Sequence, residues 1–128
     1  MPQELGEKLK SRDNFHRQYS VLWNLMMFIE SNVVSSEEVE FLYHFDMSKE
    51  EDVVTVFDAF VKEYFLSLEE EKQHQVLEVI EDALQAGDKV VEYFFEYEFG
   101  FASKEPKNKV AFLKLVKDIL VSYLTFYD

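Results

Sequence analysis

The residue pair with the clearest chemical potential is Glu71 and His74, because Glu-x-x-His pairs hold metal ions on the helices of di-iron bundles. Such a bundle needs a second copy of the pair and two further glutamates that face inward, whereas this sequence holds one copy. The apolar face expected on the same helix, at Leu77, Ile80 and Leu84, lies away from the pair. We therefore predict a polar pair exposed to solvent, with neither a metal ion nor another cofactor.

The other two histidines, His16 and His44, have acidic neighbours, but the sequence places no nucleophile beside them. A histidine that acts as general base needs an orienting partner and a substrate proton within reach. The sequence also lacks cysteine, a glycine-rich phosphate loop, a Gly-x-Ser-x-Gly turn and a His-Glu-x-x-His metal helix. Among twenty-six acidic residues, no carboxylate pair stands out as an acid and base pair. We predict that the protein is not an enzyme.

The acidic residues themselves are concentrated in the middle of the chain. Nineteen of them lie between Ser35 and Ser103, where only four residues are basic, and the net charge of the 128 residues is −13. A field of one sign repels nucleic acid and anionic membranes and attracts basic partners. The sequence therefore favours a basic protein partner over direct binding of nucleic acid or membrane.

Part of this acidity has a structural explanation, because carboxylates stabilise the positive end of the helix dipole. Eight of the nineteen acids fall in the expected first turns of helices: Glu37, Glu38, Glu50, Glu51, Asp52, Glu69, Glu70 and Glu71. Several of the others, from Glu78 to Glu98, fall in expected closing turns or at like-charge spacings, where they are mildly destabilising. A cationic partner would remove that cost, so these residues are candidates for binding.

Aromatic residues alternate with acids in the same region, from Glu92 to Phe101. Tyrosine is enriched among the residues that dominate binding energy in protein interfaces. We expect the phenylalanines to pack in the core against the helix of Trp23, and some tyrosines to be exposed. The predicted partner-binding residues are Glu71, Glu78, Glu81, Asp82, Glu92, Tyr93, Glu96, Tyr97 and Glu98.

Three Ser-x-x-Glu pairs mark the starts of the helices that must carry these residues, since each pair can form a capping box. The pairs are Ser35 with Glu38, Ser48 with Glu51, and Ser67 with Glu70. Before them, apolar residues at helical spacing from Phe15 to Ile29 predict a central, mostly buried helix. After them, Gly87 suits a left-handed helix end, and Pro106 suits the start of the final helix.

The stretch from Asp88 to Phe101 fits two patterns. Glu92 and Glu96 have helical spacing, whereas residues 95–101 alternate as in a strand. The helix is favoured, because a lone strand would leave its backbone groups unpaired. We predict an all-α fold, a single-domain bundle of about five to six helices over residues 1–128. Its most apolar run, Val21 to Ile29, is too short to cross a bilayer, and we expect a cytoplasmic protein.

A small, cysteine-free, strongly acidic and helical chain of this kind resembles the bacterial immunity proteins that neutralise nuclease toxins, including those of contact-dependent growth inhibition. The resemblance rests on the profile of the whole chain and on no motif. It implies a cytoplasmic inhibitor that binds its cognate toxin domain and blocks the active site or the substrate channel. Because immunity proteins share no residue signature, the resemblance assigns a role to no residue of this chain.

Two alternatives remain open. An acidic protein can also mimic nucleic acid and occupy the channel of a DNA- or RNA-binding enzyme, as phage anti-defence proteins do; a regular double row of acids would indicate mimicry, and a compact cluster around exposed tyrosines would indicate an immunity protein. The second alternative is a helical ligand-binding domain or an enzyme with an aromatic-lined pocket. It requires a buried polar group, for which Asn24 is the candidate.

Overall fold

The structure is a computed structural model that describes residues 19–30, 35–95 and 101–127. Every regular element within these residues is helical, and the isolated backbone bridges are Glu30 with Phe101 and Asp46 with Lys104. The all-α prediction is confirmed. A helical segment at 19–26 is followed by η1 (Met27–Ile29), α2 (Ser36–Leu42), α3 (Glu50–Phe60), α4 (Lys62–Ser67), α5 (Glu70–Ala86), α6 (Asp88–Tyr93) and α7 (Lys109–Tyr127).

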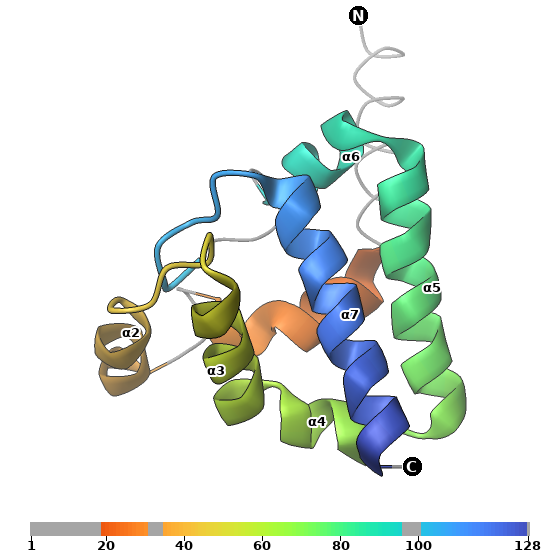
Figure 1. Cartoon of the computed structure of the whole chain (residues 1–128), viewed down its shortest axis with the longest axis horizontal. Coiled ribbons are helices and arrows are strands. Elements are labelled where there is room, and N and C mark those ends of the chain that lie inside the picture. Colours follow the sequence, from red (N-terminus) through yellow and green to blue (C-terminus); the bar gives the residue numbers. More distant parts are fainter. Residues whose placement is uncertain (1–18, 31–34, 96–100, 128) are drawn as a thin grey trace, which may run out of the picture.

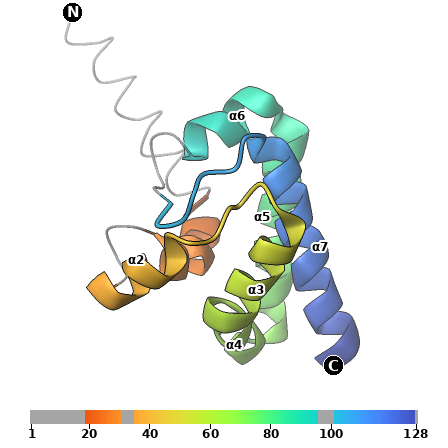
Figure 2. The same cartoon turned by 60° about the vertical axis from the view of Figure 1, so that its left-hand side comes forward.

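Helix α7 lies in the middle of the bundle and contacts α3, α4, α5 and α6 (Figure 1). Its buried residues form one broad apolar stripe, which faces the core: Phe112, Leu113, Val116, Ile119, Leu120 and Tyr123. Helix α2 lies at the edge of the bundle, on the far side of α3 from α5 (Figures 1 and 2).

The described part of the first predicted helix is buried as expected. Tyr19, Leu22, Leu25 and Met26 belong to the same core cluster as the inner residues of α5 and α7. The helix tightens into η1 before its end, and Glu30 leaves it with an extended backbone. The predicted start of this helix, at Phe15, lies outside the described residues.

The capping box at the start of α2 is confirmed. The backbone N–H of Glu38 donates to Ser35 Oγ at 3.3 Å, and the backbone N–H of Ser35 donates to Glu38 Oε1 at 3.0 Å. These two bonds satisfy groups that a helix start otherwise leaves without partners. Hydrogen bonding to Ser35 lowers the pKa of the Glu38 carboxyl, and the bond from the Ser35 backbone has a larger effect than the bond with its side chain.

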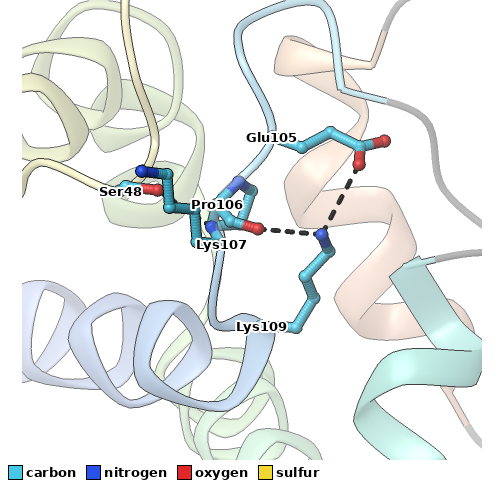
Figure 3. Close-up of polar contacts among 5 residues, drawn as sticks. All are labelled: Ser48, Glu105, Pro106, Lys107 and Lys109. Atoms are coloured by element: carbon cyan, nitrogen blue, oxygen red, sulfur yellow. Dashed lines mark hydrogen bonds and ion pairs between the residues drawn. The ribbon is translucent and has the colours of Figure 1, made fainter.

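The predicted capping box at Ser48 is wrong, because the two groups that would form it have other partners. Helix α3 begins at Glu50, and its N-cap residue Lys49 makes no side-chain capping bond. The backbone N–H of Ser48 donates to Asp46 Oδ1 at 2.9 Å, which lowers the pKa of Asp46. The Ser48 hydroxyl oxygen accepts a hydrogen bond of 2.9 Å from the backbone N–H of Lys107 (Figure 3). Ser48 therefore joins two loops instead of starting a helix.

The predicted capping box at Ser67 is also wrong. Ser67 is the last residue of α4, and its hydroxyl donates to the carbonyl oxygen of Tyr64 at 2.6 Å. Helix α5 begins only at Glu70, after Leu68 has turned the backbone to an extended conformation. The side chain of the buried Gln73 donates to the carbonyl oxygen of Phe65 at 3.0 Å, which ties the two helices together.

The last helix starts three residues later than the sequence predicts. Pro106 lies in the preceding loop, where its carbonyl oxygen accepts a 2.8 Å hydrogen bond from Lys109 Nζ (Figure 3). The helix begins after Asn108, whose Oδ1 accepts from the backbone N–H of Ala111 at 3.0 Å. A capping side chain accepts a hydrogen bond from a backbone N–H that would otherwise lack a partner, and a proline at the first helical position provides no such acceptor. Here the Asn108 cap, and not Pro106, determines where α7 begins. Lys107 is therefore not part of the helical face that Lys114 occupies.

Both patterns seen between Asp88 and Phe101 have a counterpart in the described residues. The helix favoured for the whole stretch is confirmed for residues 88–95, as α6 and a wider π turn at Phe94 and Phe95, and is wrong at Phe101. Residues 96–100 lie outside the described residues. Phe101 pairs in an isolated antiparallel bridge with Glu30, next to a 3.0 Å bond from the backbone N–H of Ala102 to the carbonyl oxygen of Ile29. A single bridge beside the end of η1 therefore provides hydrogen-bond partners for the backbone near Phe101 without the formation of a sheet.

The described phenylalanines of this region, Phe94, Phe95 and Phe101, pack inward as predicted, and Phe99 lies outside the described residues. Phe95, Phe101 and Phe112 form a cluster with ring centroids 5.3 to 5.6 Å apart. Phe94 is buried between Phe95 and Tyr19, at 5.0 and 6.5 Å. No helix among the described residues has both the length and the apolar character needed to cross a membrane.

Candidate functional site

The outer face of α5 carries a row of exposed carboxylates, Glu71, Glu78 and Asp82, which we call the acidic row. They lie seven and four residues apart, so the helical repeat of 3.6 residues places them on one face. The opposite side of α5 faces the core, where Val76 and Ile80 are enclosed. The shared exposed face agrees with the sequence analysis, and the role of these residues in partner binding stays a prediction.

The remaining predicted residues lie on α6 and beyond it. Glu92 is exposed, and Tyr93 is half-buried. Glu96, Tyr97 and Glu98 lie outside the described residues. Within the part of the chain that the structure describes, the acidic row and Glu92 make no ion pair. Four carboxylates on two neighbouring helices thus remain available to a cation from outside.

Glu81 differs from these four because it has a cationic partner inside the protein. Its Oε2 accepts a hydrogen bond from Lys117 Nζ of α7, and its Oε1 accepts one from Gln85 Nε2 at 3.3 Å. The hydrogen bond from Lys117, followed by that from Gln85, lowers the pKa of the Glu81 carboxyl. The sequence analysis treats Glu81 as a charge placed against stability, whereas the ion pair gives it a stabilising role between α5 and α7.

Asp82 also acts on the interior of the protein. Tyr19, in the helical segment 19–26, is buried, and this burial raises the pKa of its hydroxyl. The negative charge of Asp82 adds to that effect, because it disfavours a second negative charge nearby. Asp82, the last residue of the acidic row, therefore lies close to the helical segment 19–26.

An open groove of about 430 Å³ runs between α5 and α7, beside the acidic row. Its floor is aliphatic: Leu77 and Leu124 are half-buried, and Val121 is 42% exposed. Polar side chains complete the lining, namely Glu70, Gln73, His74 and Thr125. The sequence analysis missed this groove, although helical periodicity places Val121 on the same face as Lys114 and Asp118 and so indicated an exposed aliphatic residue.

The geometry of the predicted Glu71 and His74 pair is that of surface side chains. The imidazole Nε2 of His74 lies 3.6 Å from Glu70 Oε1, one turn away, and both side chains are largely exposed. Among the described residues, no group of three or more potential ligands is arranged to hold a metal ion. The prediction that this pair faces solvent is confirmed.

The polar group proposed for an aromatic-lined pocket is not where that alternative needs it. Asn24 is exposed, so the expectation of a buried Asn24 is wrong, because the helical segment 19–26 turns this position outward between Leu22 and Met26. The groove between α5 and α7 is lined by aliphatic and polar residues. Neither observation favours a ligand pocket built from aromatic rings.

The exposed aromatic rings of the described residues lie on a different element from the acidic row. Phe41 is 50% exposed in α2, and Tyr43, at the end of that helix, is 63% exposed. The sequence analysis places the exposed tyrosines near Tyr93 and misses Phe41 and Tyr43. The short length expected for α2 could have indicated this exposure. A helix of two turns that buries Leu42 directs the adjacent residues, Phe41 and Tyr43, away from the core.

Comparisons with protein-family models, with curated proteins and with solved structures give no match to this chain. Glu71, Glu78 and Asp82 line one face of α5, whereas Glu70 and Glu81 lie on a neighbouring face and contact His74 and Lys117, respectively. In the described part of α5, this arrangement is neither a regular double row of unpaired acids nor a cluster around an exposed tyrosine.

Proposed function

We propose that this protein is an inhibitor of the immunity type, which binds a basic nuclease toxin domain in the cytoplasm and blocks its active site or substrate channel. The observation that carries the proposal is the acidic row of α5, whose carboxylates have no cationic partner among the described residues. A nuclease holds phosphate groups with lysine and arginine, and carboxylates can occupy the same positions. Glu92 of the neighbouring helix α6 is a further exposed carboxylate that makes no ion pair among the described residues.

The groove beside the acidic row supports the same function. Charged residues at an interface steer the approach of the partner, whereas most of the binding energy comes from a few well-packed apolar or aromatic anchors. Leu77, Val121 and Leu124 offer an aliphatic floor on which such an anchor can be buried. A basic partner with an apolar side chain amid its cations would match both features.

The proposal is tested with a toxin candidate encoded next to this protein, a small basic domain at the end of a large secreted protein. Association of the two proteins is measured by stopped-flow fluorescence or biolayer interferometry at low and physiological salt. The variant Glu78→Lys with Asp82→Lys should slow association at least about tenfold, and salt should slow association of the unmodified protein.

The matched control is Glu63→Lys with Asp118→Lys, which changes the net charge equally but alters exposed acids of α4 and α7. This variant should slow association much less. An equal effect of the two variants would show that net charge, and not the α5 surface, governs binding. An association rate that does not respond to salt would contradict electrostatic steering.

A further inference from the structure

A second exposed surface is an aromatic patch formed by Phe41 of α2, Phe45 of the loop that follows α2, and Phe60 of α3. The ring centroid of Phe41 lies 5.2 Å from that of Phe45 and 5.9 Å from that of Phe60. Phe45 and Phe60 are half-buried, and half of Phe41 is open to solvent. Helix α2, which carries Phe41, lies at the opposite edge of the bundle from α5 (Figure 1).

The short helix α2 leaves Phe41 exposed and also fixes its position. Leu42 is fully buried and attaches α2 to the core. Successive helix residues point about 100° apart, so Phe41 projects to one side of Leu42. The backbone beneath the patch is held as well, because the N–H of Phe45 donates to the carbonyl of Leu42 and the N–H of Lys104 donates to the carbonyl of Phe45, each at 3.0 Å. A patch on a fixed backbone loses little conformational entropy when a partner binds.

The charge of helix α2 indicates the chemistry of that partner. Helix α2 carries Glu37, Glu38 and Glu40, and no basic residue. Glu37 lies one turn before Phe41, on the same side of the helix. The face of an aromatic ring also attracts cations. Guanidinium satisfies both features better than ammonium, because it stacks flat on rings and forms paired hydrogen bonds with carboxylates.

We propose that the aromatic patch, together with Glu37, is a second binding surface, and that it binds a protein segment presenting an arginine beside an apolar side chain. A second copy of this chain fits less well. A symmetric contact through this surface would bring two acidic α2 helices together, in a protein whose net charge is −13. The acidic row takes no part in this surface, so the proposed binding at the aromatic patch can be tested independently of the inhibitor function.

The test uses the full chain and a fluorescent nine-residue peptide of alternating arginine and leucine, with a glutamate and leucine peptide as its counterpart. Binding is measured by fluorescence anisotropy at physiological salt. Phe41→Ala should weaken binding of the arginine peptide at least about fivefold, because the ring contact and its apolar area are both lost. Phe41→Leu should weaken it as well, although less, since only the ring is removed.

Two controls locate the binding. Val121→Ala shortens another exposed apolar side chain, in α7, and should leave peptide affinity unchanged. Glu78→Lys with Asp82→Lys disrupts the acidic row and should retain the dependence on Phe41. Peptide-induced shifts of the NMR signals of labelled phenylalanine in the unmodified protein should affect Phe41 and Phe45, and they report the site even if Phe41→Ala unfolds.

Several results would overturn the proposal. They are equal binding of the two peptides, unchanged affinity in a folded Phe41→Ala variant, and NMR shifts confined to other phenylalanines. Sedimentation velocity supplies a further one: a dimer of the unmodified protein that Phe41→Ala converts to monomer would assign the patch to self-association.

Discussion

Gly87 joins α5 to α6 with a backbone conformation that other residues rarely adopt. Its φ is 111° and its ψ is 171°. The sequence analysis predicts a left-handed helix end here; the positive φ is confirmed, but ψ is extended instead of helical. This region is open essentially to glycine alone. Gly87 therefore lets the chain leave α5 and start α6 within one residue.

We predict that Gly87→Ala lowers the free energy of unfolding by about 1 to 3 kcal/mol. A Cβ atom at this position would meet nothing within 4 Å, so the cost arises from the backbone and not from a clash. Urea denaturation followed by circular dichroism measures the loss. Ala86→Ser, in the last turn of α5, is the control, and an equally small loss in both variants would contradict the account.

At the scale of the elements, the helix starts show which parts of the fold are readable from the sequence. A capping box forms where both side chains are free to cap, as at Ser35 and Glu38. It fails at Ser48, whose hydroxyl is bonded to Lys107, 59 residues further along the chain. Local patterns predict the existence and type of helices, whereas a competing long-range partner cannot be seen in a local pattern.

The candidate site divides in the same way. The exposure of Glu71, Glu78 and Asp82 follows from helical periodicity, so the sequence predicts it. The pairing of Glu81 does not, because Lys117 belongs to a helix whose packing against α5 the sequence leaves undefined. The exposure of Phe41 depends on the position of α2 at the edge of the bundle, which is a property of the tertiary structure.

We predict that Ser35→Ala destabilises α2 by about 1 kcal/mol, because the N-cap oxygen that accepts from the backbone N–H of Glu38 is lost, while the backbone N–H of residue 35 keeps its bond to the Glu38 carboxylate. Hydrogen exchange measured by mass spectrometry should become faster in peptides covering α2. Ser67→Ala is a matched control, since the Ser67 hydroxyl is exposed and bonds within its own helix. Comparable acceleration around α4 in the control, or unchanged exchange in α2, would show that the capping box contributes little.

At the scale of the whole molecule, three carboxyls of the described residues link stability to pH. Hydrogen bonds made in the folded chain lower the pKa of Glu38, Asp46 and Glu81. The folded state therefore releases these protons more readily than the unfolded state. The stabilisation that they contribute is complete above the ordinary carboxyl pKa and is lost as the pH falls through the lower pKa of the folded state.

We predict that Glu81→Gln reduces stability at neutral pH and that its difference from the unmodified protein disappears in acid, where Glu81 itself is protonated. Urea denaturation at a series of pH values measures this difference. Glu78→Gln is the control, because Glu78 is exposed on the same helix and makes no ion pair among the described residues. A constant difference across the pH series would show that the charge of Glu81 is not what stabilises the α5 and α7 contact.

The loop at 101–107 supplies the backbone partners of segments that precede it by more than fifty residues. Its N–H groups donate to the carbonyl of Ile29, through Ala102, and to the hydroxyl of Ser48, through Lys107, and the carbonyl of Lys104 accepts from the N–H of Met47. A ribosome delivers the chain from its N-terminus, so these partners are missing until residue 107 has emerged. During synthesis, Ile29, Met47 and Ser48 therefore lack these bonds until residues 102–107 have followed them, so the two loops are joined only after a segment more than fifty residues further along has been made.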